Sequence, residues 1–271
     1  MSAPTAPSVL SIAFLGSGSS GNCAVVRCGG TTVLVDAGLS VRETRKRLAL
    51  LGVALEDVSG VFLTHEHSDH VHGALALSKK AGLPVYATAG TADAAGFPGP
   101  LFSDVRTVRG GRELVVGEMH VRVTSTPHDG VESVCYAFAD GAGRRVGMAT
   151  DLGHLSRPVL EALRDCDALG LEANHDEDLL REGPYPAALK RRILSDVGHL
   201  SNEAAAEALR ALVGPRTRSV TALHVSRHNN TYPLAERVFK EALAEMGSAA
   251  ILAVARHDVP TEWKTVSEEA A

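Results

Sequence analysis

The chain has 271 residues, of which 45% are apolar, an ordinary fraction for a globular protein with a sizeable core. Its formal net charge of −5 argues against a protein that coats nucleic acid through bulk positive charge, although a local basic groove remains compatible with it. None of the four cysteines forms a C-x-x-C pair, and neither a signal peptide nor an apolar run of membrane-spanning length stands out. These features predict a cytoplasmic protein without a membrane segment.

Residues 1–8, rich in Ala, Pro and Ser, predict a disordered tail ahead of one domain over 9–265. Apolar runs and helical periodicity indicate the elements of that domain. In chain order we expect strands at 9–15, 23–28 and 31–35, a helix at 40–51, a strand at 58–63, a helix at 73–80, and strands at 84–87, 119–124, 133–139 and 145–149. Then follow a helix at 156–164, a strand at 168–171, helices at 186–194 and 202–213, a strand at 220–224, a helix at 233–245 and a strand at 249–255.

Local signals support several of these elements. Gly29-Gly30 predicts a hairpin turn, and Ser40 followed by Glu43 predicts a capping box at the start of a helix. Strands followed by helices, twice over, predict two similar halves. The expected fold is α/β, a single-domain αββα sandwich with two central sheets and helices outside.

A dense group of potential metal ligands follows the strand at 58–63. The chain has 12 histidines, and three of them, with one aspartate, fall in the segment His65-Glu66-His67-Ser68-Asp69-His70. Two histidines spaced two apart at the end of a strand can point the same way, and imidazole and carboxylate ligands suit Zn²⁺, Mn²⁺ or Fe. The segment therefore predicts a metal site.

This segment resembles the signature of the metallo-β-lactamase superfamily. Four motifs elsewhere in the chain extend the resemblance, and they occur in the order typical of that superfamily. They contain Asp36 in Val-Asp-Ala-Gly, His128 in Thr-Pro-His-Asp, Asp151 in Ala-Thr-Asp-Leu-Gly and His224 in Leu-His-Val-Ser. The resemblance implies two metal ions, Zn or Mn with Fe as a further option. It implies that one is bound by His65, His67 and His128, and the other by Asp69, His70 and His224. Asp151 would bridge the two metals and Asp36 would support the metal-binding loop.

Three further features favour phosphodiester chemistry, and one of them is the segment Leu171–Asp176, which adds acidic and imidazole side chains at the end of the strand at 168–171. The backbone amides of the loop Gly16–Asn22 can cradle an anion, so we expect Ser17, Ser19, Ser20 and Asn22 near phosphate, together with Arg227. Gly198-His199-Leu200-Ser201 resembles a segment of ribonuclease Z, which implies that His199 donates a proton to the leaving oxygen and that Glu172 orients it. Asp69, His199 and Glu172 are thus the predicted catalytic residues, and Asp69 is also a predicted ligand.

The segments Ser17–Asn22, Thr64–His70, Asn174–Asp176, Lys190–Asn202 and Asn229–Asn230 are similar to the YycJ/WalJ group within the superfamily. That resemblance implies a DNA 5′-exonuclease with a part in DNA repair. In such an enzyme a hydroxide held between two metals would attack phosphorus at a DNA end. Two alternatives stay open: a hydrolase of small or cyclic phosphodiesters or of thioesters, and a metal-binding regulatory protein without turnover. The oligomeric state is left open, with a homodimer as one option.

Overall fold

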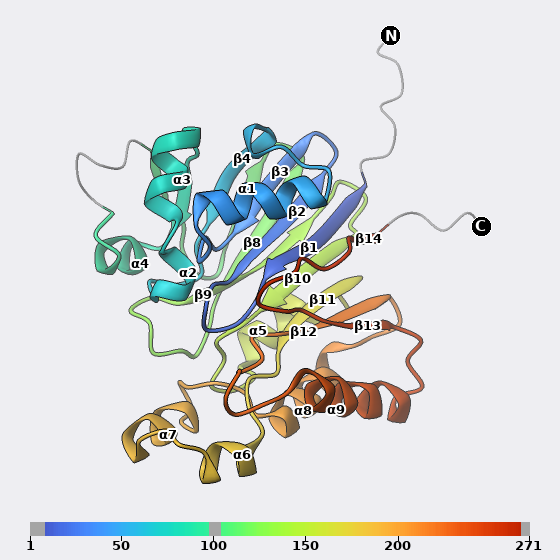
Figure 1. The fold of residues 1–271 in the computed structure, drawn as a ribbon. Coiled ribbons are helices and arrows are strands. Elements are labelled where there is room, and N and C mark those ends of the chain that lie inside the picture. The colour runs from blue at the N-terminus through green and yellow to red at the C-terminus, as the bar shows by residue number, and fades with distance from the viewer. Residues whose placement is uncertain (1–8, 98–103, 267–271) are drawn as a thin grey trace.

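The computed structural model describes residues 9–97 and 104–266, so the predicted tail at 1–8 lies outside the described residues. Two seven-stranded sheets form the centre of the molecule, and helices cover the outer face of each sheet (Figure 1). The expected αββα sandwich in one domain is confirmed. No helix in the described ranges is long and apolar enough to cross a membrane.

The first sheet has the order β14-β1-β2-β3-β4-β5-β6. Its strands are β1 (Leu10–Gly16), β2 (Cys23–Cys28), β3 (Thr31–Val35), β4 (Val58–Phe62), β5 (Val85–Ala87), β6 (Val105–Thr107) and β14 (Lys264–Val266). The helices between them are α1 (Val41–Leu50), η1 (Leu55–Asp57), α2 (Ser68–Val71), α3 (Ala74–Ala81) and α4 (Ala89–Ala94). The Gly29-Gly30 hairpin is present, and Ser40 caps α1 by accepting the backbone N–H of Glu43.

The second sheet has the order β13-β12-β11-β10-β9-β8-β7. Its strands are β7 (Arg112–Val116), β8 (Met119–Ser125), β9 (Val134–Ala139), β10 (Arg145–Ala149), β11 (Ala168–Glu172), β12 (Ser219–Leu223) and β13 (Ile251–Val254). Its helices are α5 (Arg157–Leu163), α6 (Glu177–Glu182), α7 (Ala187–Ile193), α8 (Asn202–Leu212) and α9 (Tyr232–Glu245).

Two expectations need correction. The halves are not separate in sequence, because the C-terminal strand β14 pairs with β1 at the edge of the first sheet. β14 ends at Val266, and the domain limits at 9 and 265 stay a prediction. The sequence analysis also missed β6, β7, β14, α2, α4, α6 and η1, most of which are too short or too polar to carry a periodic signal.

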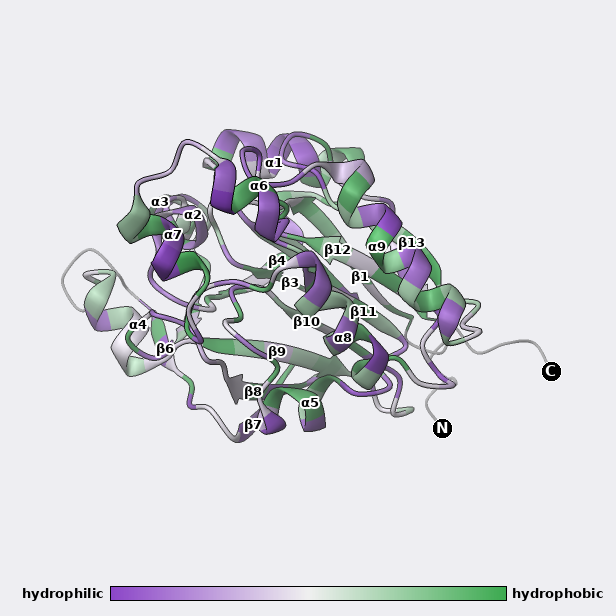
Figure 2. Cartoon of the chain, turned by 90° about the horizontal axis from the view of Figure 1, so that it is seen from below, coloured by the Kyte–Doolittle hydropathy of each residue, from purple (hydrophilic) through white to green (hydrophobic). Residues whose placement is uncertain are grey.

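Three apolar clusters hold the layers together. The first lies between the sheets, where Phe62 of the first sheet meets the rings of Tyr136 and Phe138 of the second. The second packs α5, α8 and α9 on the outer face of the second sheet, and the third packs α1 and α3 on the first. The helices turn polar surfaces outward and apolar surfaces toward the sheets (Figure 2). All four cysteines are buried within these layers.

Candidate metal centre

The predicted ligands come from segments far apart in the chain, and each segment directly follows a strand. Parallel pairing of β3 with β4, and of β10, β11 and β12 with one another, brings their carboxyl ends to common edges of the two sheets. β8 runs in the same direction as β10 because both are antiparallel to β9. Loops at such strand ends are the usual place for sites in α/β proteins.

Backbone conformation marks the same positions. Asp36, Asp151 and His224 all adopt positive φ angles of 61°, 59° and 53°, and Asp165 is the one other non-glycine residue in the described part of the chain that does so. A left-handed conformation is unfavourable for residues with a Cβ atom and is found preferentially where function requires it. Position 38 also requires glycine, because a Cβ atom there would lie 1.8 Å from the backbone oxygen of Asp69.

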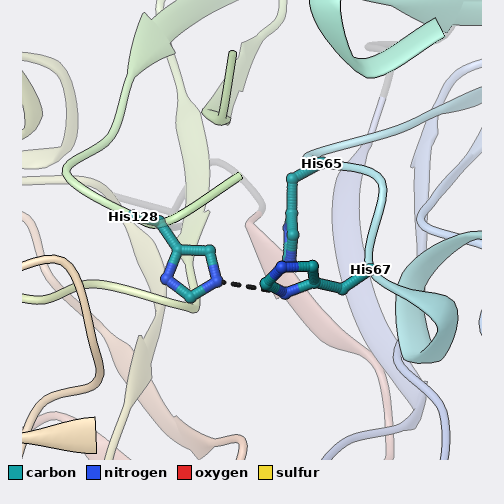
Figure 3. Close-up of side chains that lie close together, drawn as sticks. All are labelled: His65, His67 and His128. Atoms are coloured by element: carbon teal, nitrogen blue, oxygen red, sulfur yellow. Dashed lines mark hydrogen bonds between the residues drawn. The ribbon is translucent and has the colours of Figure 1, made fainter. Parts of the chain in front are cut away.

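The first group of imidazoles consists of His65, His67 and His128, which converge from two loops (Figure 3). Nε2 of His128 lies 3.4 Å from Nδ1 of His67, and Nδ1 of His128 donates to the carbonyl oxygen of Gly198. Nε2 of His65 is buried and has no hydrogen-bond partner among the described residues. Burial lowers the pKa of His65 and of His67, so both imidazoles are neutral and keep a lone pair for a metal.

The second group consists of Asp69, His70 and His224. Nε2 of His70 and Nε2 of His224 lie 3.4 Å and 3.3 Å from Oδ2 of Asp69. Asp151 lies between the two groups, with Oδ2 3.3 Å from His70 and Oδ1 3.8 Å from His128. Burial alone would lower the pKa of His224, but Asp151, Asp69 and Glu172 outweigh it and raise the pKa to about 10.

These side chains fit divalent metal ions. In each group one ligand atom per residue lies within 4.8 Å of the others, and the groups are linked by a further set of His65, His70 and Asp151. The donors are imidazole nitrogens and carboxylate oxygens, which suit Zn²⁺ or Mn²⁺. A buried imidazole nitrogen without a partner, as in His65, is costly unless a ligand satisfies it.

Asp36 holds parts of this site in place through buried hydrogen bonds. Its carboxylate is fully buried, accepts the backbone N–H and the hydroxyl of Thr64, and lies 2.8 Å from Nδ1 of His70. An Nδ1–H directed at Asp36 leaves Nε2 of His70 facing Asp69 and Asp151. Support of the metal-binding loop by Asp36 stays a prediction, and these hydrogen bonds are the contacts through which it would act.

Buried Glu172 and partly exposed His199 form a pair next to the metal groups. Oε1 of Glu172 lies 2.8 Å from Nδ1 of His199 and 3.2 Å from Nδ1 of His224. Oε2 accepts the backbone N–H groups of Leu152 and Leu200, so the carboxylate is held from several sides. Burial alone would lower the pKa of His199, but the Glu172 carboxylate outweighs it and raises the pKa above the usual 6.5.

Members of both metal groups line a cleft of about 430 Å³, namely His67, Asp69 and His224, together with Asp151 and His199. Ser19 lies in its wall, and its contact with phosphate stays a prediction. Ser17 and Asn22 instead are buried: the Ser17 hydroxyl accepts the N–H of His224, and Asn22 contacts Asp69. Instead of contacting phosphate as expected, Ser17 and Asn22 therefore each hydrogen-bond a proposed metal ligand and hold it in place.

The rest of the Gly16–Asn22 loop differs from the expected anion cradle for a similar reason. The amides of Ser17, Gly18, Gly21 and Asn22 all donate within the protein. The Ser20 hydroxyl lies 3.3 Å from Nδ1 of His257, and Arg227 lines a neighbouring cleft rather than the metal cleft.

Sequence reasoning missed Asp129. Its Oδ1 lies 3.4 Å from Nε2 of His67 and 3.3 Å from Nε2 of His128, and its carboxylate pairs with the guanidinium of Arg192 in the wall of the metal cleft. The signal was present, since Asp129 directly follows His128. What the sequence lacks is any sign that α7 brings Arg192 to it.

Comparison with known proteins agrees with this geometry. Residues 31–224 match the model of the β-lactamase superfamily domain. The chain is 36% identical over 258 residues to exodeoxyribonuclease YycJ of Bacillus anthracis, covering 94% of this chain and 97% of that one. The chain belongs to the metallo-β-lactamase superfamily, within its YycJ/WalJ group.

Two further comparisons fit this placement in the superfamily. Exodeoxyribonuclease WalJ of Streptococcus pneumoniae serotype 2 strain D39 is 36% identical over 236 residues, which cover 86% of this chain and 87% of the relative. The crystal structure of the metallo-β-lactamase fold protein YhfI of Bacillus subtilis superposes with a TM-score of 0.70, covering 93% of this chain and 99% of that one. Its identity of 15% supports the metallo-β-lactamase fold alone.

Proposed function

We propose that this protein is a dimetal phosphodiesterase that acts as a DNA 5′-exonuclease. The observation that carries the proposal is the joining of two ligand groups with a His199–Glu172 pair in one cleft. Relatives of 36% identity over most of the chain carry the name exodeoxyribonuclease, which supports DNA as the substrate. Four sparse, buried cysteines fit a reducing compartment, so a cytoplasmic location belongs to the proposal. A part in DNA repair belongs to it through the resemblance to the YycJ/WalJ group.

The proposed ligands are His65, His67 and His128 for one ion and Asp69, His70 and His224 for the other, with Asp151 shared. Two divalent cations there would lower the pKa of a bound water and stabilise negative charge on a phosphoryl group.

The protein's own residues supply the remaining steps. Nδ1 of His199 is engaged by Glu172, so Nε2 is the nitrogen left to face a substrate in the cleft. Because the carboxylate keeps His199 protonated to higher pH, the imidazolium can donate a proton to the leaving oxygen. Asp36 and Asn22 keep the second ligand group in place through His70 and Asp69.

The test is cleavage of 5′-phosphorylated single-stranded DNA by purified protein with Mn²⁺ or Zn²⁺. We expect release of mononucleotides from the 5′ end, loss of that release in His67→Ala, and no loss in His120→Ala, whose histidine is exposed on β8. DNA labelled at one end or the other reports the direction. Wild-type protein that cuts no DNA beyond the level of His67→Ala refutes the nuclease proposal. Hydrolysis of bis(p-nitrophenyl) phosphate without DNA cleavage would instead indicate a small phosphodiester substrate.

A further inference from the structure

A second cleft, of about 540 Å³, opens beside the metal cleft, and no step of the proposed reaction uses it. The segments that follow β12 and β13 and the start of α9 form its walls. Ser226 lines both clefts, so the two adjoin each other. A molecule long enough to leave the metal cleft on this side enters the second cleft.

The charged groups of the second cleft favour an anion. Arg227 and Arg256 are exposed in its lining, and Asp258 is the carboxylate there. Within the part of the chain that the structure describes, neither arginine forms an ion pair with a carboxylate. Two guanidinium groups against one carboxylate leave the cleft with net positive charge, and both guanidinium groups are available to a ligand.

The start of α9 adds to this preference. The helix has 14 residues, its N-cap is Thr231, and its first turn contains no acidic residue. The N-terminal end of a helix carries partial positive charge and attracts anions. Thr231 and Tyr232 both line the second cleft, so this end of α9 lies at the same place as the two arginines.

Arg256 is held in place by an aromatic ring. Its guanidinium carbon lies 5.2 Å from the centre of the Tyr232 ring, and the Tyr232 hydroxyl accepts the backbone N–H of His257. A stacked guanidinium keeps its N–H groups free for phosphate oxygens. Because Arg256 occupies one face of Tyr232, the cleft suits a phosphate better than a stacked base.

We propose that the second cleft binds a backbone phosphate of the DNA strand next to the phosphodiester held in the metal cleft. Arg227, Arg256 and the start of α9 bind the phosphate, and Ser226 lies on the path between the two clefts. This inference rests on the proposed function, because it assigns a place to the rest of the strand.

The experiment compares the double variant Arg227→Gln/Arg256→Gln with wild type and with Arg237→Gln, an exposed arginine of α9 outside the cleft lining. Binding of a fluorescent, hydrolysis-resistant phosphorothioate 12-mer to the metal-loaded protein is followed by anisotropy. We expect Kd to rise about tenfold or more in the double variant and the slope of log Kd against log salt to fall by about 0.7–1.4. Arg237→Gln should bind like wild type, and all three proteins should hydrolyse bis(p-nitrophenyl) phosphate equally.

Two outcomes would overturn this inference. The first is an unchanged Kd in the double variant; if inhibition by thymidine 5′-monophosphate is weaker at the same time, the cleft is assigned to the free nucleotide. The second is a parallel loss of bis(p-nitrophenyl) phosphate hydrolysis, which indicates a structural role. If wild-type protein binds DNA without cutting it, the proposed nuclease function is refuted, but the comparison of Kd values still tests whether the second cleft binds the strand. Wild-type protein that binds no DNA overturns both.

Discussion

Replacing Glu172 by Gln tests the proton-donor role of His199 most directly. The substitution keeps the shape of the side chain, and its carbonyl oxygen can still accept the N–H groups of Leu152 and Leu200. It removes the negative charge 2.8 Å from Nδ1 of His199, in a place that is completely buried. The imidazolium then loses its strongest partner while the fold is retained.

The size of the effect follows from that contact. A hydrogen bond to a charged group contributes about 1.5–3 kcal/mol, and one pKa unit corresponds to about 1.36 kcal/mol. Glu172 raises the pKa of His199, so its loss lowers that pKa by about one to two units. Activity that needs protonated His199 is lost as pH rises through this pKa. The alkaline limb of the kcat profile should therefore move about one to two pH units lower in Glu172→Gln.

The assay compares two leaving groups. A sugar hydroxyl needs a proton to leave, so a thymidine dinucleotide should lose about 10- to 100-fold in kcat at pH 8, the factor that corresponds to a pKa lowered by one to two units. p-Nitrophenolate leaves as a stable anion, so bis(p-nitrophenyl) phosphate should be little affected. Glu203→Gln, an exposed glutamate in α8, is the matched control.

Metal content is measured alongside because Glu172 also contacts His224. An equal loss of activity on both substrates with normal metal content would refute the proton-donor role. An unmoved alkaline limb would do the same.

Two further predictions concern the metal groups. Asp36→Ala leaves the Thr64 and His70 donors without their buried partner, which costs about 1–3 kcal/mol for each unsatisfied group. The free energy of unfolding, measured by urea denaturation, should therefore fall by roughly 3–5 kcal/mol. A decrease no larger than that of Asp93→Ala, which changes an exposed aspartate, would contradict this. Carboxylates raise the pKa of His70 and His224, so protons compete with a metal ion for these two imidazoles. From pH 8 to pH 6, the Zn²⁺ affinity of the group Asp69, His70 and His224 should therefore fall more steeply than that of the group His65, His67 and His128. Competitive titration with a chelating dye at both pH values measures this, and equal pH dependence of the two sites would count against it.

The sequence by itself determined most of the strands and the longer helices, because continuous apolar runs and helical periodicity are local signals. It also predicted most of the proposed site. His65, His67, Asp69 and His70 lie within six residues of one another, and the motif around each other ligand is short and directly follows a strand. Strand order then brings the loops together, as the αββα arrangement predicted.

Only the tertiary structure decided the roles of residues whose partners are distant in sequence. Ser17 and Asn22 looked like phosphate contacts, yet folding buries them against His224 and Asp69. Asp129 gained importance because α7 places Arg192 beside it, 63 residues away. The second cleft, too, forms from segments that follow different strands. Such contacts depend on how loops pack around the sheets, and no local pattern of residue types encodes that packing.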